Sequence, residues 1–379
     1  NHPWLRMATA PIHTVHALDV AIPRGRLTAV TGVSGSGKTT MILESLVPAI
    51  ESCTEDRPLP AHVTSIDPAG IERVRIVDST PIGINVRSTL ATYSGVMDML
   101  RRAFAATDAA KAREFKLADF SYNTGSLRCP QCDGTGRVDL DIQFLPDVTI
   151  PCPSCEGRRF RVEADAVRLV TPTRPQGLTM PEVLALSVDE ALAVFDPKGS
   201  VKCEMRDAAP VASNGLVAGG DTAMRTSDAI RAGVDDRIAP TLCRRIHSAL
   251  ETLSSLGLGY LTLGEDTPSL SGGEAQRLKL SNELGKKQHT SMFVLDEPTT
   301  GLHPLDVRTL IGVLQRLLDG GATIVVIEHD LDMIANADFV IDMGPGGGED
   351  GGRIVAIGAP EDIADNPDSL TGRYLRSVL

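Results

Sequence analysis

The sequence predicts an α/β fold with a parallel sheet, and three observations predict it. Apolar runs of strand length alternate with helical patterns toward both ends of the chain. A glycine-rich stretch follows the first apolar run and opens a helical one. Two C-x-x-C pairs fall in the middle of the chain, where this alternation stops. We therefore expect a layered α/β core built from both ends of the chain, with a block of a different kind between them.

The expected strands are short and mostly apolar. They span residues 26–32, 74–79, 291–296, 323–328, 339–343 and 353–357. The clearest helical patterns between them lie at 39–50 and 304–321. Strands that alternate with helices in this way are typical of α/β layering.

Composition narrows the class of protein. The 379 residues are 42% hydrophobic and 23% charged, with a net charge of −12. No apolar run reaches the roughly eighteen residues of a membrane helix, and the first residues lack the pattern of a secretory signal. We therefore expect a cytosolic protein with no membrane partner. The negative charge argues against coating nucleic acid by bulk electrostatics, so any DNA contact must be local.

The stretch GVSGSGKT, residues 32–39, fits the phosphate-binding pattern G-x-x-x-x-G-K-[ST]. Its glycines let the backbone wrap a phosphate, so that amides and the start of the following helix face negative charge. Lys38 would neutralise the β- and γ-phosphates, and the Thr39 hydroxyl would hold Mg²⁺. The expected nucleotide-binding residues are Gly32, Ser34, Gly35, Ser36, Gly37, Lys38, Thr39 and Thr40. A glycine-rich turn with a chance lysine is the alternative, and the flanking strand and helix disfavour it.

Two strands predict the catalytic residues. SMFVLDEPTTGLHP, residues 291–304, ends an apolar strand in two acids. Asp296 suits a carboxylate that supports Mg²⁺, and Glu297 suits the base that activates the attacking water. TIVVIEHD, residues 323–330, places His329 after a second strand, where it would sense the γ-phosphate. A lone acidic pair could be a solvated strand end and a lone histidine structural, but the pairing of the two strands favours catalysis.

A second anion cradle is predicted at SLSGGEAQRLKLSNEL, residues 269–284. Ser271, Gly272, Gly273 and Glu274 open a helix, so that free amides and the positive helix end face the same point. Because the chain has two phosphate cradles but one hydrolytic carboxylate pair, we expect a nucleotide to be sandwiched between the two kinds of cradle.

Four of the seven cysteines form C-x₂-C-x₁₉-C-x₂-C. This spacing is expected of a zinc site with four thiolate ligands: Cys129, Cys132, Cys152 and Cys155. Four thiolates leave no position for water, so the site should be structural. Residues 129–136 also resemble, locally, the C-x-x-C-x-G-x-G module of chaperones that bind unfolded protein, an alternative that leaves the phosphate loop unexplained.

A cluster of arginines follows the second cysteine pair. Arg158, Arg159 and Arg161 surround Phe160, and residues 97–175 hold twelve Lys/Arg against eleven Asp/Glu. Such a patch suits contact with DNA phosphates. The same arginines could instead pair with neighbouring acids on a solvated face, and the residues alone leave both possibilities open.

The motifs GVSGSGKT, LSGGEAQR and LDEPTTGLHP together resemble the ABC ATPase superfamily. The long block between the first two, with the segments at 77–105, 120–132 and 143–155, is similar to the C-terminal half of the UvrA family, damage-sensing ATPases of bacterial nucleotide excision repair. The resemblance implies an ABC-type P-loop nucleotide-binding core and an inserted, mostly helical signature domain that carries the zinc module. The implied boundaries are 1–90 and 285–379 for the core, 91–284 for the signature domain and about 120–165 for the zinc module.

The resemblance also implies a DNA-binding ATPase that uses ATP, Mg²⁺ and Zn²⁺. ATP would drive head-to-tail pairing with a second ABC half or a second copy of the chain. Duplex DNA, damaged or drug-modified, is the implied partner, with a UvrB-like protein if a longer chain carries the N-terminal half. The rival function is the ATPase subunit of a drug-exporting transporter, for which the inserted block and the zinc site would have no use.

The chain departs from the family pattern in three respects. The stretch at about 196–240 is longer and richer in small residues than the family usually has, and its Gly/Ala/Ser content predicts a mobile loop. Ser79 stands where the family has a glutamine that touches Mg²⁺, so the coupling between nucleotide and domain movement is expected to differ. Only one set of motifs is present. The chain is therefore expected to be a fragment, or a half that pairs with its own copy, and a divergent paralogue linked to resistance against DNA-binding antibiotics fits the pattern.

Overall fold

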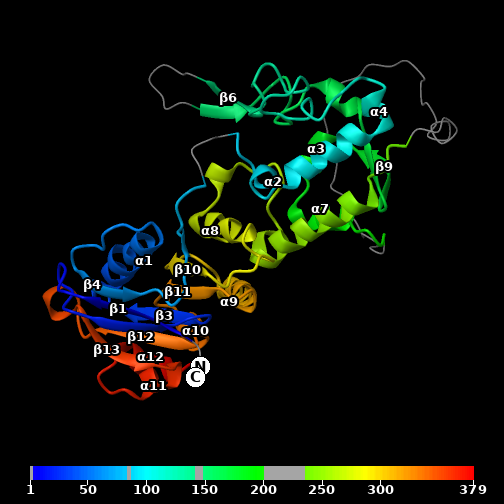
Figure 1. The fold of residues 1–379 in the computed structure, drawn as a ribbon. Helices are drawn as coiled ribbons and strands as arrows, with labels where there is room; N and C mark the ends of the chain where they lie inside the picture. Colours follow the sequence, from blue (N-terminus) through cyan, green and yellow to red (C-terminus); the bar gives the residue numbers. More distant parts are fainter. Residues whose placement is uncertain (1–2, 83–86, 141–147, 200–234) are drawn as a thin grey trace. The chain divides into compact units, whose positions relative to one another are not determined.

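The computed structural model describes residues 3–82, 87–140, 148–199 and 235–379, which divide into two compact units (Figure 1). The sheet unit comprises Asn1–Ile82, Ser255–Leu258 and Ser269–Leu379. The insert unit comprises Gly83–Ser254 and Gly259–Pro268. Most of the loop predicted at about 196–240, including Cys203, lies outside the described residues.

The sheet unit contains a six-stranded sheet in the order β13-β12-β3-β11-β10-β5. Its strands are β3 (Leu27–Gly32), β5 (Arg73–Val77), β10 (Ser291–Asp296), β11 (Thr323–Ile327), β12 (Phe339–Gly344) and β13 (Arg353–Gly358). All neighbours are parallel except β12 and β13. The predicted α/β class is confirmed by this sheet. Because β3, β11 and β10 are adjacent and parallel, the segments that follow them meet at one edge, where open α/β sheets bind ligands.

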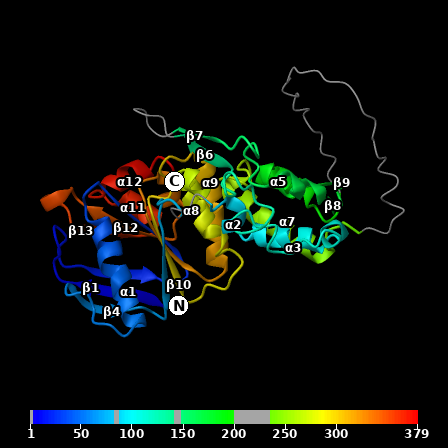
Figure 2. The same ribbon diagram turned by 90° about the horizontal axis from the view of Figure 1, so that it is seen from above.

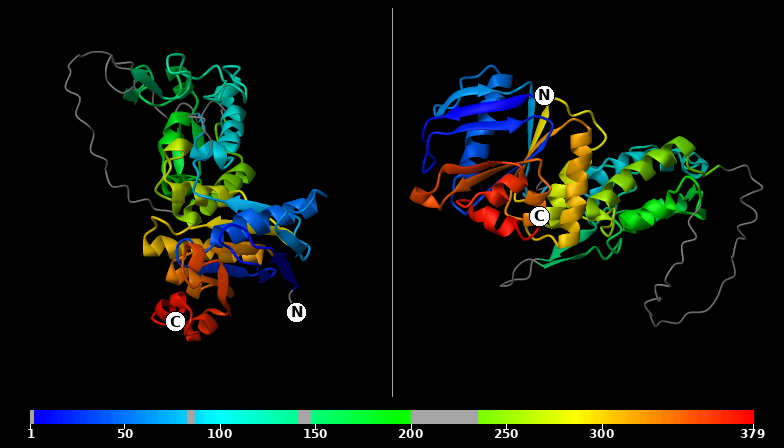
Figure 3. Two further views of the ribbon diagram at one scale, coloured as in Figure 1. Left: turned by 90° about the vertical axis from the view of Figure 1, so that its left-hand side faces the viewer. Right: turned by 90° about the horizontal axis from the view of Figure 1, so that it is seen from below.

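The helices of the sheet unit follow these strands in turn. They are η1 (Thr40–Leu46, a π-helical segment), α1 (Val47–Thr54), α8 (Gly272–Ser281), α9 (Pro304–Asp319), α10 (Leu331–Ala335), α11 (Pro360–Asp365) and α12 (Leu370–Leu375). Figure 1 shows α11 and α12 together beside β12 and β13. Both ends of the chain belong to this unit, as the two views of Figure 3 show.

A second, antiparallel sheet was not predicted. It has the order β2-β1-β4, with β1 (Trp4–Thr9), β2 (Asp19–Pro23) and β4 (Val63–Asp67). One apolar core contains side chains from this sheet, from the six-stranded sheet and from η1, for example Leu5, Val294 and Ile42. Each fully buried aliphatic side chain stabilises the fold by roughly 1.5–3 kcal/mol. The helix that follows the phosphate loop is therefore anchored in the core of the unit.

The insert unit combines helices with two small hairpins. Its elements are α2 (Leu90–Tyr93), α3 (Val96–Ala106), α4 (Asp108–Lys111), β6 (Arg137–Leu140), β7 (Val148–Pro151), β8 (Leu169–Thr171), β9 (Arg174–Leu178), α5 (Met180–Ala185), α6 (Val188–Val194) and α7 (Pro240–Leu253). The helices α3 and α7 pack side by side (Figure 2). Hairpin β6-β7 joins the two cysteine pairs.

Candidate nucleotide site and metal centre

The predicted phosphate loop begins where β3 ends, at Gly32, and leads into η1. Lys38 is only 6% exposed, and its Nζ donates to the carbonyl oxygens of Gly32 at 2.9 Å and Val33 at 3.0 Å. Gly37 has φ of 95°, and a Cβ there would lie 2.4 Å from Cγ2 of Val15. No side chain fits at that position, so the loop keeps the tight path that the motif predicts.

A second glycine-rich stretch, residues 345–352, packs against the phosphate loop. The N–H of Gly348 donates to the carbonyl of Gly35 at 3.0 Å, and the N–H of Gly352 donates to the carbonyl of Ser36 at 3.1 Å. Within the described part of the chain, the buried hydroxyl of Ser36 has no hydrogen-bond partner. The stretch at 345–352 thus fixes the phosphate loop, while the hydroxyl of Ser36 keeps a free hydrogen-bonding position among the described residues. This arrangement fits a phosphate ligand, because phosphate oxygens accept hydrogen bonds.

The predicted catalytic acids lie at the same edge of the six-stranded sheet as the phosphate loop. Asp296 ends β10, and the next residue, Glu297, donates its N–H to the carbonyl of Ile327 on β11 at 2.9 Å. Glu297 has φ of 43°, a costly conformation for a residue with a side chain, and such residues cluster at functional sites. Its Oε1 lies 3.6 Å from Nε2 of His329. The structure thus brings the predicted base and the predicted sensor together.

At this edge of the sheet, several carboxylates surround the ammonium group of Lys38. Burial lowers the pKa of Lys38, while the carboxylates of Glu297, Asp296 and Asp342 act in the opposite direction. Burial raises the pKa of Asp296, and the charge of Glu297 raises it further against the opposing charge of Lys38. Grouped carboxylates of this kind are stabilised by a bound divalent cation, so the residues fit Mg²⁺.

The predicted second cradle lies at the start of α8. Ser271 caps the helix, and its Oγ accepts the N–H of Glu274 at 3.4 Å. The carboxylate of Glu274 accepts the N–H of Ser271 at 2.7 Å in return. Glu274, predicted to bind nucleotide, therefore uses its carboxylate in a capping box that fixes the helix tip. Gly272 and Gly273 complete the tip.

The signature helix α8 is tied to the segment after β5, which ends at Val77 rather than at the predicted residue 79. The side chain of Gln276 donates to the carbonyl of Val77 at 2.8 Å, and Nζ of Lys279 donates to Oδ1 of Asp78 at 2.6 Å. Burial would raise the pKa of Asp78, but the bonds from Lys279 and Thr80 lower it. These bonds clamp the segment at 77–80 to the signature helix.

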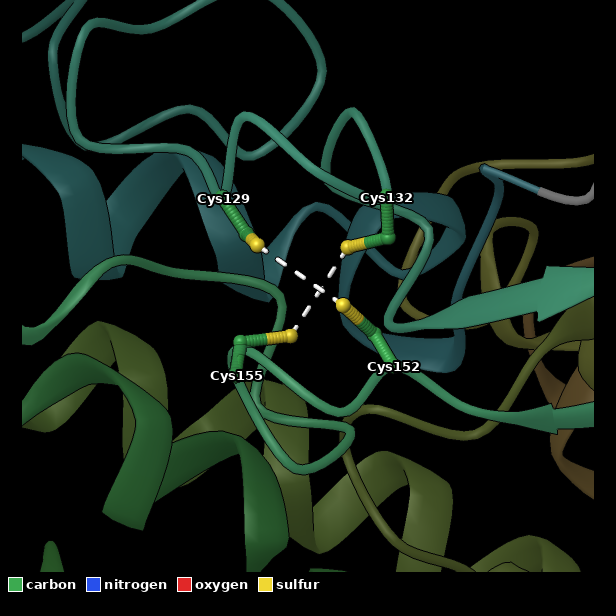
Figure 4. Close-up of side chains that lie close together, drawn as sticks. All are labelled: Cys129, Cys132, Cys152 and Cys155. Carbon is green, nitrogen blue, oxygen red and sulfur yellow. Dashed lines mark hydrogen bonds between the residues drawn. The ribbon is translucent and has the colours of Figure 1, made fainter.

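The four predicted metal ligands converge in the insert unit (Figure 4). Their sulfur atoms all lie within 4.8 Å of one another. Cys129 and Cys152 are 3.9 Å apart at Sγ, and Cys132 and Cys155 are 3.7 Å apart. A tetrahedral zinc with bonds near 2.3 Å requires sulfur separations of about 3.8 Å. The N–H of Gly136 also donates to Sγ of Cys132 at 3.2 Å. The geometry fits a structural zinc ion.

The thiol pKa values indicate why this cluster needs a cation. Burial would raise the pKa of Cys129, but the amides of Cys132 and Gln131 outweigh it and lower the pKa to about 7. Burial and the neighbouring Cys132 raise the pKa of Cys155 to about 12. One thiolate is therefore easy to form and further ones are opposed. A divalent cation removes that opposition.

The three arginines predicted to contact DNA do not form one exposed patch. Arg159 is only 6% exposed, forms an ion pair with Asp266 and stacks over the ring of Tyr122 at 5.2 Å. Arg158 is paired with Asp165 at 2.7 Å. Arg161 is exposed and lines a polar hollow of about 640 Å³. Arg159 is therefore turned inward, whereas Arg158 and Arg161 are exposed.

Two residues that the sequence analysis missed link the backbone segments that form the nucleotide site. Glu328 lies between the apolar strand β11 and His329, is 2% exposed, and accepts three backbone N–H groups. Lys279 holds α8 to the segment at 78–80. An acid that interrupts an apolar run next to a candidate histidine was the available signal for Glu328. Nothing local in the sequence points to Lys279.

Together the fold, the phosphate loop and the paired strand ends define the nucleotide-binding core of an ABC-type ATPase. No protein-family model matches the chain. Known proteins do match: the UvrABC system protein A of Streptococcus pyogenes serotype M1 is 39% identical over 384 residues, which is 100% of this chain and 35% of that protein. The protein of the same name from Mycobacterium tuberculosis (strain CDC 1551 / Oshkosh) is 39% identical over 380 residues, 99% of this chain and 34% of that protein.

A solved structure agrees with these relatives. The crystal structure of UvrA2 from Deinococcus radiodurans is 38% identical and superposes with a TM-score of 0.77, covering 99% of this chain and 39% of that one. The chain belongs to the UvrA family, as one of its ABC ATPase halves, and spans about 35% of the length of the first curated relative. None of the helices in the described part of the chain combines the length and apolar character needed to cross a membrane.

Proposed function

We propose that this chain is the ATP-hydrolysing half of a DNA-binding ABC ATPase of the UvrA type, acting in excision repair or in the recognition of damaged or drug-modified DNA. The observation that carries the proposal is the meeting of four side chains at one edge of the sheet. They are Lys38, Asp296, Glu297 and His329. Relatives that match over the whole chain are named for the UvrABC system, which supports the DNA substrate.

In this proposal the phosphate loop binds the triphosphate with its amides, and Lys38 neutralises the β- and γ-phosphates. Thr39 and Asp296 would hold Mg²⁺, which would supply positive charge against the phosphate oxygens. Glu297 orients and deprotonates the attacking water, and His329 holds Glu297 and the γ-phosphate in register. The carboxylate of Glu297 is 52% exposed, so water reaches it.

Closure of the site requires a second cradle. The tip of α8, held rigid by the capping box of Ser271 and Glu274, would seal the triphosphate bound by a second copy or a second ABC half. The insert unit, with its zinc module and the exposed Arg161, would then engage duplex DNA.

Replacing Glu297 with Gln tests hydrolysis. The variant should keep ATP binding and lose turnover roughly 100- to 10,000-fold, because the general base is removed while the phosphate loop is intact. Steady-state phosphate release and equilibrium binding of a fluorescent ATP analogue measure the two quantities. Glu361→Gln, at an exposed position of α11, is the matched control and should behave as the unaltered chain. Normal turnover in Glu297→Gln contradicts the catalytic assignment.

DNA as substrate is tested separately. Phosphate release from the unaltered chain, measured with no DNA, with intact duplex and with adduct-bearing duplex, should change on addition of duplex. A rate indifferent to all three, together with no ATP-dependent shift of duplex in a gel, would leave an ATPase without the proposed DNA role.

A further inference from the structure

Glu328 is a buried acid whose carboxylate, among the residues that the structure describes, accepts its hydrogen bonds from backbone N–H groups. It is 2% exposed, and a buried carboxylate is costly unless hydrogen bonds stabilise its charge. Its Oε1 accepts the N–H of Thr299 at 2.8 Å. Its Oε2 accepts the N–H groups of His329 at 2.8 Å and Asp330 at 3.1 Å. Three amide donors to one carboxylate make a strong, charge-assisted network.

These three amides belong to two different segments. Thr299 follows Glu297 in the segment that leaves β10, while His329 and Asp330 open the segment that leaves β11. The ladder between these two strands ends with the bond from Glu297 N–H to the carbonyl of Ile327. Beyond that bond, the carboxylate of Glu328 joins the two segments, beside the 3.6 Å contact of Glu297 with His329.

Packing alone does not hold the reacting side chains. Glu297 and His329 are 52% and 46% exposed at their side chains, and the closest approach between them is 3.6 Å. Their relative position therefore depends on the backbone that carries them. The glutamate backbone is also strained, with φ of 43°, so it persists only where its surroundings enforce it.

We propose that Glu328 is a positioning residue for hydrolysis: by bridging the segments after β10 and β11, it sets the distance between the base Glu297 and the sensor His329. The proposal rests on the proposed function, because it assigns Glu328 a part in the same reaction. Glu328 does not touch the nucleotide; it acts through the two residues that do.

The chemistry of the side chain makes the test specific. In Glu328→Gln one oxygen becomes an NH₂ group, which would face an N–H donor and cannot accept its hydrogen bond. The bridge then holds one segment and releases the other. Glu328→Asp keeps the charge but is one methylene shorter, so it cannot reach both segments at the observed distances.

The experiment measures kcat, KM and ATP-analogue affinity in the full chain. Glu328→Gln should lower kcat roughly 100-fold, the cost of a misplacement of about 1 Å at a reacting group, with analogue affinity unchanged. The kcat of Glu328→Asp should lie between that of Glu328→Gln and that of the unaltered chain. Glu283→Gln is the matched control, since Glu283 is also buried, at 8% exposure, and bonds to Gln288 away from the site. It should keep the kcat of the unaltered chain.

A double-mutant cycle separates positioning from general structural support. If Glu328 acts through His329, then Glu328→Gln should cost little further activity in a His329→Ala background. Full additivity of the two losses overturns the proposal, as does a normal kcat in Glu328→Gln. Should Glu328→Gln fail to fold, the kcat of Glu328→Asp decides: a loss with unchanged analogue affinity supports the proposal and an unaltered rate overturns it. If the unaltered chain hydrolyses no ATP, the proposed function fails instead.

Discussion

The phosphate loop and the cysteine module are both built from glycine-rich turns, but different forces hold the two in shape. The phosphate loop is flanked by β3 and η1, which share an apolar core with both sheets. Around the cysteine module, the buried cluster among the described residues consists of the four cysteines, with Val138 packed against them. The first site is therefore shaped before any ligand arrives, whereas the second depends on the metal that its thiols bind.

Metal removal is the strongest test of this difference. Chelation, or Cys155→Ser, should release the zinc and unfold the module locally, since bound zinc contributes roughly 10 kcal/mol to comparable small structural sites. Metal analysis should fall from one zinc per chain to none. Amide exchange should accelerate across residues 127–161 and stay slow in β3 and β11.

Cys53→Ser is the control for that experiment, because Cys53 is an exposed thiol outside the cluster. It should keep its zinc and its exchange pattern. Protection that survives across residues 127–161 after the metal has gone would break the comparison, because the module would then be held by contacts other than the metal.

The two regions also differ in how far the sequence predicts them. The six-stranded sheet could be predicted because each strand is a short apolar run ending at a recognisable motif. The antiparallel sheet was missed because its strands are short and half-exposed, as in Trp4–Thr9, and because the pairing of β1 with the distant β4 leaves no local mark. Strand β5 ends at Val77, and Lys279, 201 residues beyond Asp78 in the chain, donates to the carboxylate of Asp78 just past that end.

The site residues that belong to sequence motifs were predicted, but the residues that hold them in position were not. Lys38 and Asp296 belong to spacings that phosphate and metal chemistry impose. Glu328 acts through amides that only the folded chain brings near it. The inward position of Arg159 could not be predicted because neighbouring arginines look alike in a sequence, and Asp266 and Tyr122 decide which of them turns inward.

A smaller effect should follow from disturbing the packing of the phosphate loop. Gly347 lies against that loop, and a Cβ there would sit 2.5 Å from the carbonyl oxygen of Ser34. Gly347→Ala should push the loop out of shape and weaken ATP-analogue binding roughly tenfold, about 1.4 kcal/mol. Gly312→Ala is the matched control: it lies inside α9 with open space around its Cβ position, and it should bind normally while gaining stability.

Equal ATP-analogue affinity in the Gly347→Ala and Gly312→Ala chains would also contradict this comparison of the two sites. It would mean that bound nucleotide, rather than packing, determines the shape of the phosphate loop. Isothermal titration with a non-hydrolysable analogue distinguishes the two cases, because a loop ordered by its ligand shows an added entropic cost of binding.

The smallest predicted effect concerns the surface beside the metal site. Arg161 is exposed at the edge of a polar hollow, so Arg161→Ala should remove one phosphate contact without altering the fold. We expect duplex affinity to fall roughly fivefold, about 1 kcal/mol, and the salt dependence of binding to lose about one charge. Fluorescence anisotropy with labelled duplex at several salt concentrations measures both.

Arg158→Ala provides the contrast within the same segment, because Arg158 is already bound to Asp165. Removing it should change DNA affinity less than removing Arg161, since its charge is partly offset by that carboxylate before DNA arrives. If Arg158→Ala weakens binding more, the ion pair must open on DNA, and phosphate competes successfully with Asp165. If neither change affects binding, DNA approaches the insert unit at another face, and the cysteine module serves to hold the hairpin β6-β7 in place rather than to present these arginines.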